Sequence, residues 1–188
     1  MIIVLIGTSS SGKSSVSQVL QRQLGDGWLQ FSVDGYLGML GDKFLGLNPD
    51  NPEVTIPNDI SYAKKHEDGT YQIIPGKFCS KLYATIPDVL ETLAKQGFSI
   101  IVDSLIDFKE DLETYRNKLN PFGVLFVYLE VDESTMEQRE KSRGNRLPGS
   151  AKHWLKSFTC RDSADMIIDT TDKSIAEIGA VILDNISQ

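Results

Sequence analysis

The chain has few cysteines, no long apolar run and no excess of positive charge over its 188 residues. Cys79 and Cys160 belong to no Cys-X-X-Cys or Cys/His cluster, which argues against a disulfide framework or a zinc site and suits a reducing cytosol. No run approaches the roughly 18 apolar residues of a membrane span, and the opening residues lack the basic start of a signal peptide. The 26 acidic residues outnumber the 19 basic ones, which disfavours nucleic-acid or anionic-membrane partners. We therefore expect a cytoplasmic protein with neither partner; its oligomeric state is open.

Short apolar runs alternate with segments of helical spacing. The runs cover residues 2–6, 29–33, 98–102, 124–131 and 166–168. The helical segments cover residues 14–24, 78–96, 112–119, 133–142 and 175–186. Near-continuous Val, Ile and Leu suit strands covered on both faces, so we predict a single α/β domain with a five-stranded parallel sheet between helices. Pro87 should divide or kink the helix predicted over 78–96.

Residues 7–14 directly follow the first apolar run and satisfy the complete pattern GxxxxGK[ST]. The glycines allow successive amide groups to turn around phosphate oxygens, and Lys13 adds a charge toward the β and γ phosphates. The Ser14 hydroxyl can bind Mg²⁺, and the following helix presents its positive end to the same anion. A flexible Ser/Gly turn would not require the lysine. We predict ATP and Mg²⁺ as cofactors, held by Gly7, Thr8, Ser9, Ser10, Ser11, Gly12, Lys13, Ser14 and Ser15.

Two aspartates stand where predicted strands end, which is where ligands gather in open parallel sheets. If the first and third strands are neighbours, Asp103 would reach the Mg²⁺ beside Ser14. Asp34 is then available to accept a proton from an acceptor hydroxyl. The plainer alternatives are that Asp34 and Gly35 form a turn and that Asp103 caps a helix. Which aspartate is the base and which is linked to the metal stays open.

Two segments depart from the regular alternation. Residues 35–70 are long, irregular and punctuated by Gly and Pro, which indicates either a substrate-facing insertion or a mobile surface loop. Residues 139–161 hold seven Lys and Arg against one acid, and we expect a lid at about 139–152 whose Arg139, Arg143 and Arg146 close over the triphosphate. A solvated basic face is an alternative, and a nucleic-acid patch is a third that the scarcity of interleaved aromatics weakens.

Several of these segments together resemble the chloramphenicol phosphotransferase-like family, and the resemblance spans nearly the whole chain. It rests on residues 7–15, 28–34, 100–104, 143–146, 148–149 and 169–171. It implies a P-loop kinase fold and transfer of the ATP γ-phosphoryl group to a hydroxyl of a small molecule. By the same resemblance Asp34 is the base, Lys13 and Ser14 hold phosphate and Mg²⁺, the three arginines belong to the lid, and Thr170 and Thr171 flank adenine. Residues 35–70 do not align with the antibiotic-binding part of the family, so the acceptor is open.

Other classes of function remain as alternatives. A GTPase switch would carry an Asn-Lys-X-Asp segment, and the nearest run, Asn-Lys-Leu-Asn at residues 117–120, lacks the aspartate. A regulatory or interaction protein that binds nucleotide without phosphorylating an acceptor is the second candidate. A kinase acting on nucleic acid or on a sugar nucleotide remains within the enzyme class, and acceptor screening separates it from the leading hypothesis.

Overall fold

The computed structural model describes residues 1–41, 44, 59–143, 149–155 and 158–186, apart from the side chains of Arg143 and His153. Its main sheet has five parallel strands in the order β2-β5-β1-β6-β7. These strands are β1 (Ile2–Ile6), β2 (Trp28–Ser32), β5 (Ser99–Asp103), β6 (Val124–Glu130) and β7 (Met166–Asp169). The five predicted strands are confirmed to within about one residue at each end. The first and third of them are neighbours, because β1 pairs directly with β5.

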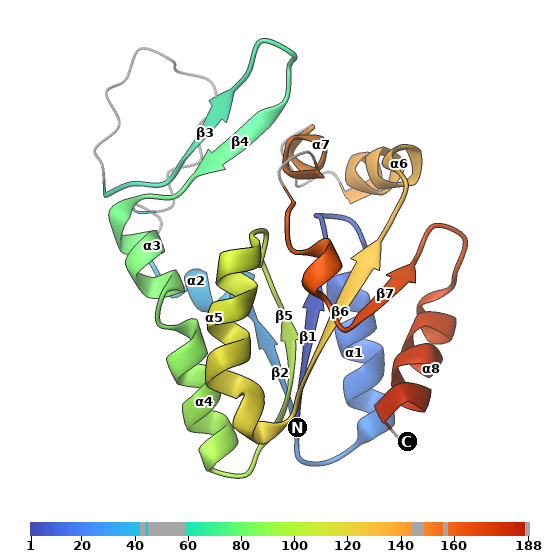
Figure 1. The fold of residues 1–188 in the computed structure, drawn as a ribbon. Helices are drawn as coiled ribbons and strands as arrows, with labels where there is room; N and C mark the ends of the chain where they lie inside the picture. Colours follow the sequence, from blue (N-terminus) through green and yellow to red (C-terminus); the bar gives the residue numbers. More distant parts are fainter. Residues whose placement is uncertain (42–43, 45–58, 144–148, 156–157, 187–188) are drawn as a thin grey trace.

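Helices cover both faces of this sheet (Figure 1). On one face lie α4 (Ile86–Lys95) and α5 (Lys109–Leu119), and on the other lie α1 (Lys13–Leu24) and α8 (Ile175–Ile186). Alternate residues of β1 enter the two cores: Ile2, Val4 and Ile6 pack toward α4 and α5, whereas Ile3 and Leu5 pack toward α1 and α8. All five are fully buried, which is why this strand reads as a continuous apolar run. The three-layer α/β prediction is confirmed.

The helix predicted over 78–96 is two helices, α3 (Lys77–Tyr83) and α4 (Ile86–Lys95). Pro87 lies in the first turn of α4, where its missing N–H would have no intrahelical acceptor. The predicted division at this proline is confirmed.

The prediction that residues 35–70 are irregular is wrong in part. The short helix α2 (Val33–Leu37) runs into this stretch, and β3 (Tyr62–Lys65) forms an antiparallel hairpin with β4 (Tyr71–Ile74). At the hairpin turn, Oδ1 of Asp68 accepts from the Thr70 amide at 3.0 Å. Residues 42–43 and 45–58 lie outside the described part of the chain.

Beyond the sheet's carboxyl edge the hairpin and α3 stand on one side, and α6 (Glu133–Arg143) and α7 (Ser150–Leu155) stand on the other (Figure 1). Short 3-10 turns occur at Asn120–Phe122 and Arg161–Ser163. Among the described helices, none is both long and apolar enough to cross a membrane.

Candidate active site

The loop between β1 and α1 has a backbone shape that depends on glycine. Gly7 has φ +143°, and a Cβ built there would lie 2.4 Å from the carbonyl oxygen of Leu129 on β6. Gly12 has φ +99°, and Ser10 is the one non-glycine residue with positive φ in the described chain, at +67°. These left-handed positions and the close approach to β6 curl the loop tightly over the end of β1.

This loop buries hydroxyl groups that find no hydrogen-bond partner within the described structure: those of Thr8, Ser9, Ser10 and Ser11. The ammonium of Lys13 folds back onto the loop, where Nζ donates to the carbonyl oxygens of Gly7 at 2.7 Å and Thr8 at 2.8 Å. Unsatisfied buried polar groups are rare in folded proteins and commonly mark a place for a polar ligand. The first amides of α1 also lack intrahelical acceptors, so the loop and the helix end together suit an anion.

The two predicted aspartates, Asp34 and Asp103, meet the loop of residues 7–14, which we call the P-loop, in one small pocket. Its lining residues are Ser9, Ser10, Gly12, Lys13, Ser14, Asp34, Asp103 and Leu105. Asp103 is the last residue of β5, opposite Leu5 of β1, so the strand order brings it beside the loop. Asp34 arrives from the next strand out, because α2 begins directly after β2.

Asp34 and Gly35 are not an isolated turn. They belong to the first turn of α2, where the Ser32 hydroxyl accepts from the Gly35 amide at 3.1 Å and caps the helix.

Ser14 and Asp103 fit the way proteins bind Mg²⁺, which keeps several waters and uses one or two carboxylates together with substrate phosphates. The described residues contain no group of three or more His, Cys, Asp and Glu that could hold a metal ion without such phosphates. The exposed Ser14 hydroxyl and the Asp103 carboxylate lie in the same pocket as Lys13. The donor set therefore matches a metal that arrives with a nucleotide.

Arg139 of α6 contacts the backbone of the P-loop through its guanidinium group. Its guanidinium donates to the carbonyl oxygen of Thr170 at 2.9 Å and contacts that of Ser10 at 3.4 Å. The fully buried Thr170 hydroxyl bonds to the carbonyl oxygens of Glu130 at 2.9 Å and Ser11 at 3.2 Å. Arg139 and Thr170 together join the P-loop to β6 and α6.

The other predicted site residues are spread more widely. Thr171 lies beside Thr170, and its hydroxyl accepts from the Asp132 amide at 3.1 Å. Ser15 is exposed on α1 and lines neither the small pocket nor the larger cavity beside it. Arg143 ends α6 but its side chain is outside the described residues, as is the whole of Arg146. Of the three predicted lid arginines, the structure therefore describes the contacts of Arg139 alone.

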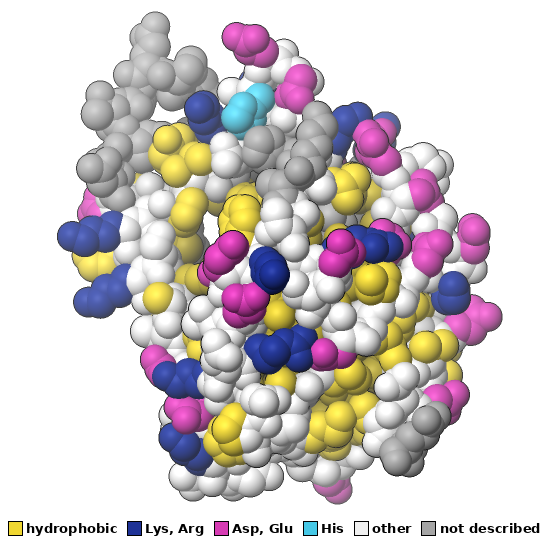
Figure 2. Space-filling model, in the orientation of Figure 1, with side chains coloured by type: hydrophobic (Ala, Val, Ile, Leu, Met, Phe, Trp, Pro, Cys, Tyr) yellow, Lys and Arg dark blue, Asp and Glu magenta, His cyan; other side chains and the backbone are white. Residues whose placement is uncertain are grey.

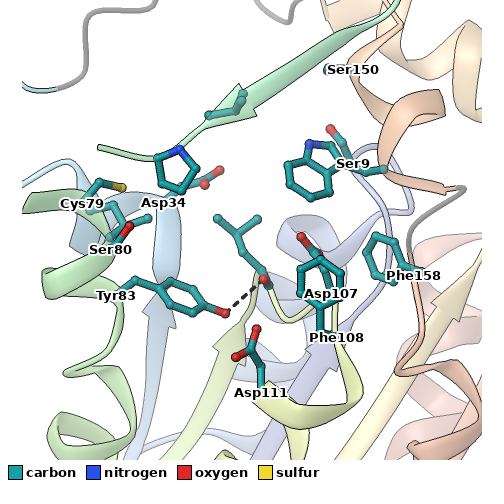
Figure 3. A pocket seen from close by; sticks show the side chains of 16 residues that line it. Ser9, Asp34, Cys79, Ser80, Tyr83, Asp107, Phe108, Asp111, Ser150 and Phe158 are labelled. Carbon is teal, nitrogen blue, oxygen red and sulfur yellow. Dashed lines mark hydrogen bonds between the residues drawn. The ribbon is translucent and has the colours of Figure 1, made fainter. Parts of the chain in front are cut away.

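A larger cavity of about 350 Å³ opens next to the P-loop. It lies between the α2, α3 and β4 side and the α5 and α7 side, and Figure 3 shows its lining side chains converging on an open centre. Its walls are mainly apolar, and Figure 2 shows hydrophobic side chains around a hollow between the hairpin side and the main body. The aromatic residues in the lining are Tyr83, Phe108, Trp154 and Phe158. Gly7, Ser9 and Asp34 place the P-loop end of the cavity beside the small pocket.

Two further carboxyl groups line this cavity and were missed by sequence reasoning. Burial raises the pKa of Asp107 to about 7, opposed by the nearby charge of Lys13 and assisted by that of Asp111. Burial also raises the pKa of Asp111. Asp107 lies on the connection after β5 and Asp111 lies in the first turn of α5, and neither belongs to a sequence motif. The only signal was their position shortly after the strand-ending Asp103.

Tyr83 forms part of the same wall. Its hydroxyl donates to the carbonyl oxygen of Leu105 at 3.1 Å, as drawn in Figure 3, and burial raises the pKa of this phenol above its ordinary value. Tyr83 therefore remains neutral, with its ring facing the cavity.

Comparison with known proteins identifies the family of the chain and its fold. A family model described as chloramphenicol phosphotransferase-like protein matches residues 1–187. A relative from Mycobacterium tuberculosis, named "Putative O-phosphotransferase", is 23% identical over 177 residues, covering 94% of this chain and 78% of the relative.

Among solved structures, a gluconokinase from Sinorhizobium meliloti has a TM-score of 0.61 at 20% identity, covering 98% of this chain and 94% of its own. The Mycobacterium tuberculosis APS kinase, solved with AMPPNP and APS, has a TM-score of 0.59 at 14% identity, covering 100% and 97%. These likenesses confirm the predicted P-loop kinase fold.

Proposed function

The chain belongs to the chloramphenicol phosphotransferase-like family of kinase-like phosphotransferases, and we propose that it transfers the γ-phosphoryl group of ATP to a hydroxyl of a small molecule. The observation that supports this most strongly is the position of Asp34, which lines both the small P-loop pocket and the larger cavity. A phosphoryl donor in the first and an alcohol in the second would meet at this carboxylate.

In the proposed reaction the P-loop amides and Lys13 hold the triphosphate, and Ser14 and Asp103 hold Mg²⁺. The metal ion, when bound, neutralises phosphate charge. Asp34 accepts the proton of the acceptor hydroxyl while that oxygen attacks the γ phosphorus in line. The new O–P bond forms as the bond from phosphorus to the β–γ bridging oxygen breaks, and ADP leaves with the bridging electrons.

The remaining roles complete the proposal. Arg139, already on the P-loop, would with Arg143 and Arg146 supply positive charge to the transferred group from a lid at about residues 139–152. Thr170 and Thr171 would place the adenine. Residues 35–70 would be the substrate-facing insertion of a single cytoplasmic domain, since the hairpin that begins within it continues into the cavity wall at β4.

The charge of the cavity narrows the acceptor class. Three carboxyl groups face it, from Asp34, Asp107 and Asp111, and no Lys or Arg is among its described lining residues. An acceptor bearing a carboxylate or phosphate would lose its water without gaining a Lys or Arg partner in the described lining, and it would add negative charge beside carboxyl groups whose pKa values are already raised, which is unfavourable. The proposal therefore favours a neutral or cationic alcohol with an apolar body.

The test is acceptor-dependent release of ADP from Mg-ATP, with the phosphorylated product identified by mass spectrometry. The screen contains chloramphenicol and three aryl alcohols of different charge: 2-amino-1-phenylethanol, 1-phenylethane-1,2-diol and mandelate. We expect turnover with at least one neutral or cationic compound and none with mandelate. A preference for mandelate would contradict the inferred charge of the acceptor.

Lys13→Ala tests the nucleotide half of the proposal. We expect it to abolish turnover and weaken Mg-ATP binding, measured by calorimetry, at least about tenfold, because the lysine charge on the phosphates is lost. Lys109→Ala is the matched control. It also removes a lysine charge, but Lys109 is exposed on α5 and its ammonium makes an exposed ion pair with Glu113 at 3.7 Å. ATP binding without turnover of any acceptor would leave a nucleotide-binding protein, and no ATP binding would remove the proposal altogether.

A further inference from the structure

Glu140 is a buried carboxylate that the proposed chemistry does not use. It lies on α6 with only 7% of its surface exposed. Its Oε2 accepts from the Gly149 amide at 2.8 Å, and its Oε1 accepts from the Ser150 hydroxyl and the Ala151 amide, both at 3.1 Å. Burying a carboxylate is costly unless hydrogen bonds replace its water, and here three donors converge on the two oxygens.

The segment that Glu140 holds is the start of α7, which forms part of the cavity wall. Ser150 and Trp154 of α7 both line the cavity. On its other side the segment meets the hairpin, because a Cβ on Gly149 would lie 3.3 Å from Cα of Thr70. The start of α7 is thus packed between the α6 carboxylate and the hairpin.

Glu140 also follows Arg139, whose guanidinium lies on the P-loop carbonyls. Consecutive residues of one helix therefore reach two different parts of the site. Arg139 anchors α6 to the nucleotide side, and Glu140 anchors α7 to α6.

From this arrangement we propose that Glu140 is a positioning residue that sets the acceptor-side wall of the cavity by holding the start of α7 against α6. Its effect on catalysis rests on the function proposed above, whereas its effect on the wall does not. Glu140 touches neither of the two pockets, so it acts through Ser150 and Trp154.

The first measurement needs no ligand. The chain has two tryptophans, so Trp28→Phe leaves Trp154 as the only one. In that background we expect Glu140→Ala to increase acrylamide quenching of Trp154 and to shift its emission to the red, because α7 loses its anchor. Glu140→Gln keeps one carbonyl oxygen for two of the three donors but sets its NH₂ against the Gly149 amide. We therefore expect its Trp154 quenching and emission wavelength to lie between those of the parent protein and those of Glu140→Ala. Glu113→Ala is the matched control, since it makes the same Glu-to-Ala change at an exposed position of α5, where Glu113 lies 3.7 Å from Lys109 of the same helix.

The second measurement separates positioning from a general loss of structure. For the best alcohol found in the screen, Glu140→Ala should raise the acceptor KM about tenfold, while the ATP KM stays within about twofold of wild type. Far-UV circular dichroism and the melting temperature verify folding. If Glu140→Ala does not fold, Ser150→Ala, which removes one donor to Glu140, is compared by Trp154 quenching alone, because Ser150 itself lines the cavity. Trp154 quenching unchanged in the folded variant, or equal rises in both KM values, would overturn the proposal. Failure of ATP binding in the wild type would remove the kinase function, and the quenching result would still decide the role of Glu140.

Discussion

Gly7 lies so close to Leu129 that a side chain at Gly7 would collide with the Leu129 carbonyl oxygen, 2.4 Å from the built Cβ. Gly7→Ala should therefore push the P-loop away from β6, lowering the melting temperature and weakening Mg-ATP binding. Gly97→Ala is the control, because Gly97 also has positive φ, at +88°, but nothing lies within 4 Å of its Cβ position. Thermal melts and calorimetry check both variants. Equal ATP affinity in the two would show that the contact with Leu129 does not shape the phosphate site.

Asp34 and Asp103 can be assigned by comparing two isosteric variants. Asp34→Asn should lower turnover by about 10²–10⁴-fold with ATP affinity nearly unchanged, because only proton acceptance is lost. Asp103→Asn should instead raise the Mg²⁺ concentration needed for half-maximal activity. Steady-state kinetics over a range of Mg²⁺ concentrations measure both effects. The reverse pattern would exchange the two roles, and full activity of Asp34→Asn would exclude it as the base.

Arg139→Ala should slow phosphoryl transfer by about 10²-fold or more, since it removes a charge beside the P-loop together with its bonds to the Ser10 and Thr170 carbonyls. The same direction is expected for Arg143→Ala and Arg146→Ala, with turnover affected more than nucleotide binding. Single-turnover rates and ATP dissociation constants provide the comparison. Arg22→Ala, on the exposed side of α1, is the control. Wild-type values for all three lid variants would leave the arginines as a basic surface.

Asp107→Asn should stabilise the protein at neutral and alkaline pH. The pKa of Asp107 is raised by burial to about 7 in the folded chain, against an ordinary value near 4. Between about pH 4 and about pH 7 the carboxyl group has released its proton in the unfolded chain but retains it in the folded chain. The free energy of unfolding therefore falls as pH rises from about 4 to about 7, and this loss persists at higher pH.

The expected result for Asp107→Asn is a gain of a few degrees in melting temperature at pH 8 and little gain at pH 4, since 1 kcal/mol corresponds to about 2–4 °C at this chain length. Melting curves across this range test it, with the exposed Asp172→Asn as control. A gain that is larger at pH 4 than at pH 8 would contradict the cause given for the raised pKa.

Local patterns were enough to predict the strands and the P-loop. The central strands β1, β5 and β6 are short apolar runs that are largely buried, so their composition alone reveals them. The edge strands β2 and β7 are more exposed but are short apolar runs as well, and the phosphate loop is a contiguous pattern of eight residues. Asp34 and Asp103 could be singled out because strand ends are readable from the same runs. Their meeting in one pocket needed the strand order β2-β5-β1, which no local pattern specifies.

The hairpin and the larger cavity could not be predicted in this way. Each strand of the hairpin has only four residues, which is too short for alternation to stand out from a loop rich in Gly and Pro. The cavity combines residues as distant in the sequence as Gly7 and Phe158, and the raised pKa of Asp107 comes from burial there. In the sequence Glu140 is a single acidic residue in a basic segment. Its role follows from the folded structure, where the start of α7 packs against it and the Gly149 amide donates to its carboxylate. Strand runs and the P-loop motif depend on residues that are neighbours in the sequence, so the sequence alone reveals them. The burial of Asp107 and the meeting of side chains in the cavity depend on contacts between distant segments, which exist only once the chain has folded.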